Sequence, residues 1–191
     1  MGKVVLSQHT SLDGVMQSPG TTDVPFKYRG WVVDFDAGPE RDRLQLEEAQ
    51  NAGALLLGRV TYEAMQAFWP TADGEFADRL NELPKYVVSS TLTDPAWKAT
   101  VLGEDWPEEV ARLRKELDGE IVVYGSRRLS RALIELGLVD ELRLMVYPVL
   151  LGAGDRLFGE TQDKIPMRLV DSRPFGGGVM SMIYAPDIAD G

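Results

Sequence analysis

Short apolar runs and helical stripes of apolar residues alternate along this chain. The runs are short and often β-branched, which predicts buried strands at residues 3–7, 54–57, 86–88 and 121–124. Apolar residues at helical spacing and local start and stop signals predict helices over residues 39–51, 62–69, 76–83 and 106–117. We expect Gly53 to end the first of these helices. The clearest stripe has the i, i+3, i+4, i+7 spacing of one helix face and consists of Leu129, Ala132, Leu133 and Leu136.

The C-terminal third has a different pattern. A long strand is predicted at 142–149, and two further strands at 167–170 and 179–184 join around the glycines at 176–178 as an antiparallel hairpin. The repeated strand–turn–helix order before them is typical of a parallel sheet. The sequence therefore predicts one domain over residues 1–191, an α/β three-layer α/β/α fold. Its central sheet is mixed and mainly parallel, with a C-terminal antiparallel hairpin.

Composition and charge exclude several classes of partner and of catalytic site. The 191 residues carry a formal net charge of −10, which disfavours nucleic acid and anionic membranes as partners. The absence of cysteine excludes disulfides, thiolate nucleophiles and cysteine-ligated zinc, and the single histidine, His9, excludes a multi-histidine metal site. The sequence contains no long apolar segment, so we expect no membrane span, no signal peptide and a cytoplasmic location.

Three predicted strands end in turns suited to an anion. The turns are Gly58-Arg59-Val60-Thr61, Ser89-Ser90-Thr91 and Gly125-Ser126-Arg127-Arg128. Ligands of open α/β sheets bind beyond the carboxyl ends of the strands, so these turns are expected to meet at one crevice. Glycine allows the backbone to approach a ligand closely, and free N–H groups at a helix start favour phosphate. Each turn alone is more often an ordinary capping device, but the three together indicate a dinucleotide.

Other sequence motifs are missing or incomplete. The chain has no GxxxxGK[ST] phosphate loop and no GxSxG nucleophile elbow. Gly152-Ala153-Gly154 lacks the third glycine of a dinucleotide fingerprint, and no helical pattern follows it. We therefore interpret His9 as a strand-end residue with satisfied hydrogen bonds rather than as a member of a catalytic triad.

Four segments together resemble a known family. They are Ser11–Gly14, Leu55–Met65, Val123–Leu142 and Tyr147–Phe158. In order and spacing they are similar to the dihydrofolate reductase-like superfamily. The resemblance is to the group related to the reductase domain of the bifunctional riboflavin-biosynthesis deaminase-reductase. It implies a sheet flanked by helices and NADPH as the hydride donor.

The resemblance also implies roles for individual residues. Residues matching the cofactor-binding turns are Gly58, Arg59, Thr61, Ser89, Ser90, Gly125, Ser126, Arg127, Arg128 and Leu129. Of these, Ser89 and Ser90 match the strand end that holds the adenosine 2′-phosphate, for which Arg59 offers a fork of donors. Asp13 and Gly14 match a mobile loop near the nicotinamide.

The chain departs from the family pattern on the substrate side. Ser126 replaces the second glycine of the third turn, and Tyr124 stands where riboflavin-pathway reductases carry a substrate-contacting glutamate. Asp42 is a candidate for the acidic proton donor of dihydrofolate reductases, and alternatively a solvated charge at a helix start.

We expect an NADPH-dependent reductase of a small pterin-like or riboflavin-precursor-like heterocycle, with Tyr124, Asp42 or water as the proton donor. The alternative is a non-catalytic nucleotide-binding protein on the same fold. The resemblance also suggests a homodimer, for which the apolar segment 142–151 is either an interface or core.

Overall fold

The structure is a computed structural model that describes residues 2–20, 25–159 and 164–187. The strands are β1 (Val4–Ser11), β2 (Ala52–Gly58), β3 (Lys85–Val88), β4 (Ala99–Leu102), β5 (Glu120–Tyr124), β6 (Glu141–Tyr147), β7 (Met167–Pro174) and β8 (Met180–Pro186). The α-helices are α1 (Pro39–Asn51), α2 (Arg59–Gln66), α3 (Glu75–Glu82), α4 (Trp106–Glu116) and α5 (Arg127–Glu135). Three short 3₁₀ segments are η1 (Trp31–Asp34), η2 (Trp69–Thr71) and η3 (Gly176–Gly178).

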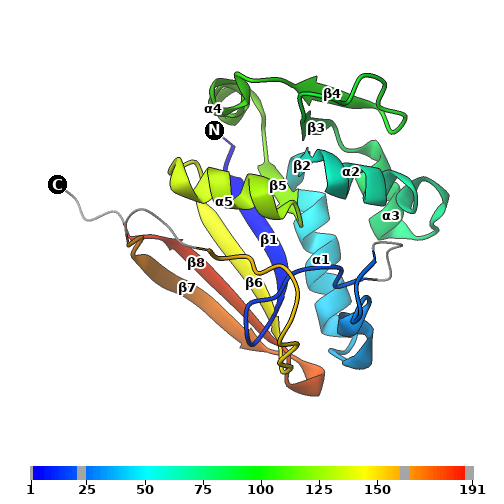
Figure 1. Cartoon of the computed structure of the whole chain (residues 1–191), viewed down its shortest axis with the longest axis vertical. Helices are drawn as coiled ribbons and strands as arrows, with labels where there is room; N and C mark the ends of the chain where they lie inside the picture. Colours follow the sequence, from blue (N-terminus) through cyan, green and yellow to red (C-terminus); the bar gives the residue numbers. More distant parts are fainter. Residues whose placement is uncertain (1, 21–24, 160–163, 188–191) are drawn as a thin grey trace.

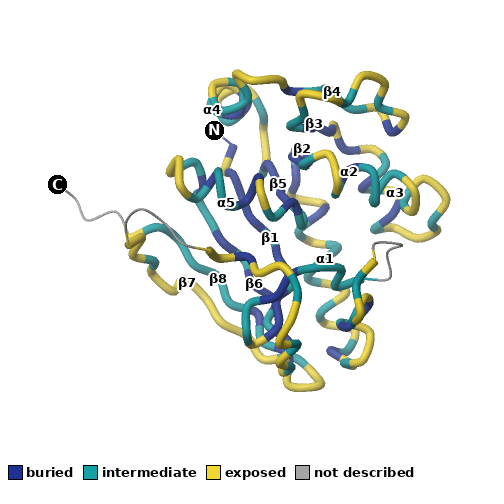
Figure 2. Tube along the Cα trace, viewed as in Figure 1, coloured by how far each residue is buried: buried dark blue, intermediate teal, exposed yellow. Residues whose placement is uncertain are grey.

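All eight strands form one sheet in the order β4-β3-β2-β5-β1-β6-β8-β7 (Figure 1). Neighbouring strands from β4 to β6 pair in parallel, whereas β8 pairs antiparallel with both β6 and β7. The predicted α/β class, mainly parallel sheet and C-terminal antiparallel hairpin are confirmed. The central strands are buried, whereas β7 is exposed along most of its length (Figure 2). This difference in burial explains why the central strands have apolar sequences and β7 has a more polar one.

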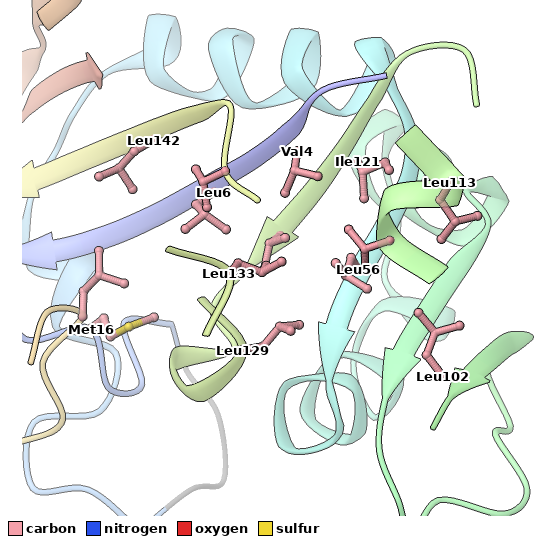
Figure 3. Close-up of a cluster of buried hydrophobic side chains, with 14 of the residues drawn as sticks. Val4, Leu6, Met16, Leu56, Leu102, Leu113, Ile121, Leu129, Leu133 and Leu142 are labelled. Carbon is pink, nitrogen blue, oxygen red and sulfur yellow. The ribbon is translucent and has the colours of Figure 1, made fainter. Parts of the chain in front are cut away.

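Apolar side chains cover both faces of the central strands. On one face, Leu6, Ile121 and Val123 pack with Leu129 and Leu133 of α5, in a cluster that also includes residues of α4 (Figure 3). On the other face, residues of β2, β3 and β5 pack against α1, α2 and α3. Burial on both faces explains the continuous apolar runs of these strands, since neither side has to meet water.

Several details of the chain differ from the sequence prediction. Strand β1 continues to Ser11 instead of ending at residue 7, and α2 begins at Arg59 instead of residue 62. Helix α1 ends at Asn51 and β2 begins at once, so Gly53 lies inside the strand, at an irregularity in the pairing with β5. A Cβ atom at Gly53 would lie 2.1 Å from the carbonyl oxygen of Asp118, so glycine is required here for a close approach of two backbones. Strand β4 was not predicted. It is short and lies at the edge of the sheet, which weakens its apolar pattern.

The loop between β1 and α1 is held down by aromatic packing. Trp31 is 3% exposed, and its ring meets the ring of Tyr147 edge-on at a centroid distance of 5.4 Å. Phe35 packs against the same tyrosine. Trp31 and Phe35 therefore anchor this loop on Tyr147. Within the described part of the chain, no helix has the length and apolar character needed to cross a membrane.

Candidate functional site

The first and third predicted turns are in direct contact. The backbone N–H of Gly58, at the end of β2, donates to the hydroxyl oxygen of Ser126 over 2.9 Å. The N–H of Ser126 donates in turn to Oγ1 of Thr61, also over 2.9 Å. Because β2 and β5 are neighbours in the sheet, these bonds tie together the starts of α2 and α5. The convergence expected from the sequence is confirmed for these two turns.

The third turn has a backbone that favours glycine. Gly125 has φ of 55°, and a Cβ atom there would lie 3.2 Å from a side-chain atom of Thr61. Ser126 also has a left-handed backbone, with φ of 54° and ψ of 48°. This conformation costs a residue with a side chain roughly 1–2 kcal/mol. Ser126 thus keeps the conformation that glycine adopts easily, and its hydroxyl gains the bond from Gly58.

The second turn joins the first through Arg59. The Arg59 guanidinium donates to Oγ1 of Thr91 over 2.6 Å and to the Glu63 carboxylate over 2.7 Å. The hydroxyl oxygen of Ser89 accepts bonds from the N–H groups of Thr91 and Leu92, which shapes this turn. Neighbouring Ser90 is exposed. The Arg59 guanidinium, a group that binds phosphate, therefore lies between two of the three turns.

Helices α2 and α5 both begin without a side-chain cap. Gly58 precedes α2 and has no side chain to offer, and the Ser126 hydroxyl, which precedes α5, is turned toward Gly58 instead. The first N–H groups of a helix have no partner within the helix and concentrate its positive dipole end. Two such ends lie side by side here, which is an arrangement that binds anions well.

The arginines after the third turn have different surroundings. Arg127 pairs with Asp155 at 3.0 Å, whereas Arg128 is exposed. Arg131, one turn further along α5, donates to the carbonyl oxygens of residues 156–158. It therefore holds a loop rather than facing the turn. Leu129 is 6% exposed and its Cβ lies close to the position of Gly58.

Asp13 connects two loops. Its carboxylate accepts bonds from the Ser11 hydroxyl at 2.6 Å and from the N–H groups of Leu151 and Gly152 at 3.1 and 2.9 Å. The bond from Ser11, followed by the backbone bonds, lowers the pKa of Asp13 to about 2. Gly14 adopts a left-handed turn with φ of 77°. In this structure Asp13 shapes the loops at the end of β1.

The two candidate proton donors lie in contrasting environments. Asp42 is 69% exposed and lies 3.1 Å from Arg41, on a groove of about 440 Å³ between α1 and α3 that Trp69 and Phe76 also line. Tyr124 has a buried hydroxyl without a hydrogen-bond partner among the described residues. Burial first, and then the charge of Glu48, raises the pKa of Tyr124 well above its ordinary value. The phenol of Tyr124 therefore stays protonated at neutral pH.

A polar cluster between α1 and the sheet was missed by the sequence reasoning. Gln45 of α1 donates to Nε2 of His9 over 3.1 Å, and Arg41 donates to the Gln45 side-chain oxygen over 2.9 Å. The other ring nitrogen of His9 bonds to the Tyr147 hydroxyl at 3.0 Å. One turn further along α1, Glu48 pairs with Arg143 of β6 at 3.1 Å. Arg41, Gln45 and Glu48 are three or four residues apart, and this polar stripe was the available signal.

His9 is uncharged at neutral pH. Both of its ring nitrogens have partners, which confirms its interpretation as a satisfied strand-end residue. Burial, and secondarily the positive charge of Arg41, lower the pKa of His9 to about 4. His9 lies two residues beyond Ser7, the partner of Tyr124 in the β1–β5 register. The cluster therefore borders the same sheet edge as the Gly125 turn.

The sheet and the converging turns define a dihydrofolate reductase-like α/β protein. Residues 2–181 match the family model of the RibD C-terminal domain. The chain belongs to this reductase-type family. It is 35% identical over 189 residues to the uncharacterized protein YyaP of Bacillus subtilis (strain 168), covering 95% of this chain and 94% of YyaP. It is 27% identical to the uncharacterized protein YwjB of the same organism, covering 93% and 94% of the two chains.

Solved structures share the fold at low sequence identity. A Shewanella sp. PV-4 protein provisionally assigned to riboflavin biosynthesis has a TM-score of 0.75 and 21% identity, covering 98% of this chain and all of that one. Dihydrofolate reductase from Enterococcus faecalis, solved with NADP(H) and RAB-propyl, has a TM-score of 0.66 and 16% identity, with 98% of each chain covered. These likenesses establish the dihydrofolate reductase-like fold.

Proposed function

We propose that this protein binds NADPH at the three converging turns and reduces a small heterocyclic substrate, pterin-like or riboflavin-precursor-like. The observation that carries the proposal is the pair of uncapped helix starts, α2 and α5, joined through Gly58 and Ser126. Membership of the RibD C-terminal domain family supports it. The NADP(H) bound by the Enterococcus faecalis reductase of the same fold adds further support.

The residues present fit such a cofactor. The free N–H groups at the starts of α2 and α5 would donate to phosphate oxygens, and the absence of a Cβ at Gly125 lets this turn pack closely against Thr61 of the other helix start. Arg59, with Ser89 and Ser90 beyond it, would bind the 2′-phosphate through its guanidinium fork. When bound, NADPH supplies the hydride. The chain itself would orient the ring and hold substrate near Tyr124.

Direct titration tests cofactor binding. Tryptophan fluorescence should fall, and that of NADPH should rise, as the complex forms at micromolar concentrations. No binding at several hundred micromolar NADPH would refute the proposal.

A variant of Arg59 tests the 2′-phosphate role. Arg59→Ala should weaken NADPH by roughly ten- to a hundredfold, as expected for a charge-assisted contact of about 1.5–3 kcal/mol, and leave NADH little changed. Arg112→Ala is a matched control, because Arg112 is also exposed and paired with a glutamate four residues on. Equal losses for both cofactors, or an equal loss in the control, would contradict the role of Arg59.

A second candidate is a nucleotide-binding protein without catalysis. The buried, protonated phenol of Tyr124 and the exposed carboxylate of Asp42 favour it, because neither resembles a group prepared to deliver a proton. NADPH binding without oxidation across a panel of pterins and flavin precursors would support this alternative. Turnover of any of them would exclude it.

A cytoplasmic location and a homodimer are also proposals. Leu142 and Leu144 are 4% and 8% exposed, so the start of the 142–151 segment is core rather than interface. Self-association would use surface beyond that start, such as Leu150, which is 72% exposed, or the open edge of β7, where Leu169 and Val170 are each 51% exposed. Sedimentation velocity at micromolar concentration distinguishes monomer from dimer.

A further inference from the structure

A groove opens between the first turns of α1 and α3. Further along, the two helices are in contact, since Ala49 of α1 and Leu80 of α3 pack in one buried cluster. Arg79 of α3 also donates to the carbonyl oxygen of Ala49 over 3.1 Å. The volume of the groove is about 440 Å³, within the roughly 300–1,000 Å³ of small-molecule sites. The described residues that line it come from the starts of both helices and from Trp69.

The groove lies toward the edge of the sheet where the cofactor turns converge. Glu48 of α1 pairs with Arg143, the register partner of Ser7 in β1. Gln45, almost one turn earlier in α1, reaches His9, two residues further along β1. Helix α1 therefore runs against β1, and its first turn lies toward the carboxyl ends of the strands. Early residues of α3 face early residues of α1 across the groove, so both helices begin near this edge.

The floor of the groove is apolar and aromatic. Leu46, Trp69 and Phe76 line it and are half-buried. The rings of Trp69 and Phe76 meet edge-on at a centroid distance of 5.3 Å. Both rings pack against the same buried cluster as the ring of Tyr124, at the end of β5. A flat ligand can therefore lie on a fixed apolar surface here, and aromatic rings attract a cation placed over them.

The rim of the groove is mainly acidic. Asp42, Asp73 and Glu75 supply three exposed carboxylates. Arg43, also exposed, supplies the single guanidinium among the described lining residues. Asp42 is compensated by Arg41 at 3.1 Å, which leaves the carboxylates of Asp73 and Glu75 against the charge of Arg43. The net charge of −10 on the whole chain also favours an approaching cation.

We infer that the groove between α1 and α3 binds a planar heterocycle bearing a protonated amine or amidine, and that the acidic start of α3 makes it reject anionic heterocycles. This inference rests on the proposed function, because the groove would hold the substrate of that reaction. A flat cation would lie against Trp69 and Phe76 and turn its N–H groups toward the carboxylates at the rim. An anionic group on the same ring would meet these carboxylates as like charges.

The test uses three planar probes of similar size, the cation 2-naphthamidine, the neutral 2-naphthamide and the anion 2-naphthoate. Their dissociation constants are measured by calorimetry on the whole chain, with and without saturating NADPH. We expect 2-naphthamidine to bind at least about tenfold more tightly than 2-naphthoate, with 2-naphthamide between them. An exposed carboxylate contributes roughly a factor of 1.4 to 5, and an exposed aromatic ring about two- to fivefold.

Variants of the rim and of the floor locate the preference. Asp73→Asn combined with Glu75→Gln removes two charges while keeping their shape, and should reduce the preference for the amidine over the naphthoate at least about threefold. Phe76→Leu keeps an apolar side chain without the ring, and should weaken the amidine about two- to fivefold more than the neutral amide. Glu104→Gln combined with Glu108→Gln is the matched control. It also removes two exposed carboxylates near a helix start, but at α4, on the other face of the sheet.

Several results would overturn the inference. They are equal binding of the amidine and the naphthoate, tighter binding of the naphthoate, no binding of the amidine up to millimolar concentration, and an equal loss of preference in the control at α4. NADPH affinity is measured in the same proteins. Failure of the unmodified chain to bind NADPH rejects the proposed function, whereas intact NADPH binding without a preference for the cation rejects only the role of the groove.

Discussion

His9 is the single histidine of the chain, so its pKa directly tests the contact between Gln45 of α1 and the sheet. The pKa of His9 is lowered to about 4 from 6.5, so the folded state resists protonation of the imidazole. A proton on Nε2 would set an N–H against the Gln45 amide, which also donates. Since the unfolded chain takes up the proton first, stability is fully present above pH 6.5 and falls as the pH drops toward 4.

The size of the effect follows from the difference between the two pKa values. Between pH 7 and pH 5 the unfolded state gains nearly a full proton that the folded state lacks, which costs about 2 kcal/mol. The full loss, complete only below pH 4, is about 3 kcal/mol. Such a loss is a large part of the ~5–15 kcal/mol typical of a folded domain. Asp13 does not contribute to this loss between pH 7 and pH 5. Its pKa is lowered from 3.8 to about 2, so the stability that it provides is lost only as the pH falls below 3.8.

Two measurements check this prediction. The imidazole resonances of the only histidine in the chain can be followed by NMR against pH, and they should titrate near 4 in the folded protein. Urea unfolding at pH 7 and pH 5, followed by tryptophan fluorescence, should show the loss of about 2 kcal/mol, and His9→Asn should show a much smaller one. A measured pKa of 6.5 or above, or the same pH dependence in His9→Asn, would refute the described hydrogen-bond chain.

Four further changes have expected outcomes. Gln45→Glu replaces the donor facing His9 by a carboxylate, so the NMR pKa of His9 should rise; an unchanged value would contradict the contact. The pKa of buried Lys85 is lowered to about 8, so folding stability should increase by up to about 3 kcal/mol as the pH rises from 8 toward 10.5, and Lys85→Met should lose this increase in urea unfolding. Ser126→Ala removes the acceptor for the Gly58 N–H, so it should lower the free energy of unfolding by roughly 1–3 kcal/mol and weaken NADPH binding in titrations. No change in either quantity would contradict a role for the contact between the two turns. Asp13→Asn loses acceptor strength toward Leu151 and Gly152 and should lower the unfolding midpoint by an amount equivalent to about 1–3 kcal/mol, whereas Asp171→Asn on exposed β7 should have little effect.

Local patterns determined much of the fold and the place of the site. The apolar run of β2, the helical stripe of α5 and the glycines around 176–178 each depend on neighbours in the sequence, so strand, helix and hairpin could be predicted from them. Three strands ending in turn residues implied one crevice, because parallel strands end at one edge. The contacts of Ser126 with Gly58 and Thr61 confirm that two of these turns meet.

Only the tertiary structure decided which residues of α1 lie against the sheet. Which residues of α1 face the sheet depends on the rotation and direction of the helix over β1, so the sequence did not show that Gln45 contacts His9 while Asp42 is 69% exposed. Arg131 turned toward distant carbonyl groups, and Gly53 proved necessary because Asp118 approaches it from another part of the chain. These outcomes depend on contacts between segments far apart in sequence, which local periodicity does not encode. The sequence by itself thus located the edge of the sheet where the turns converge, and the packing of α1 on the sheet decided which of its side chains lie beside that edge.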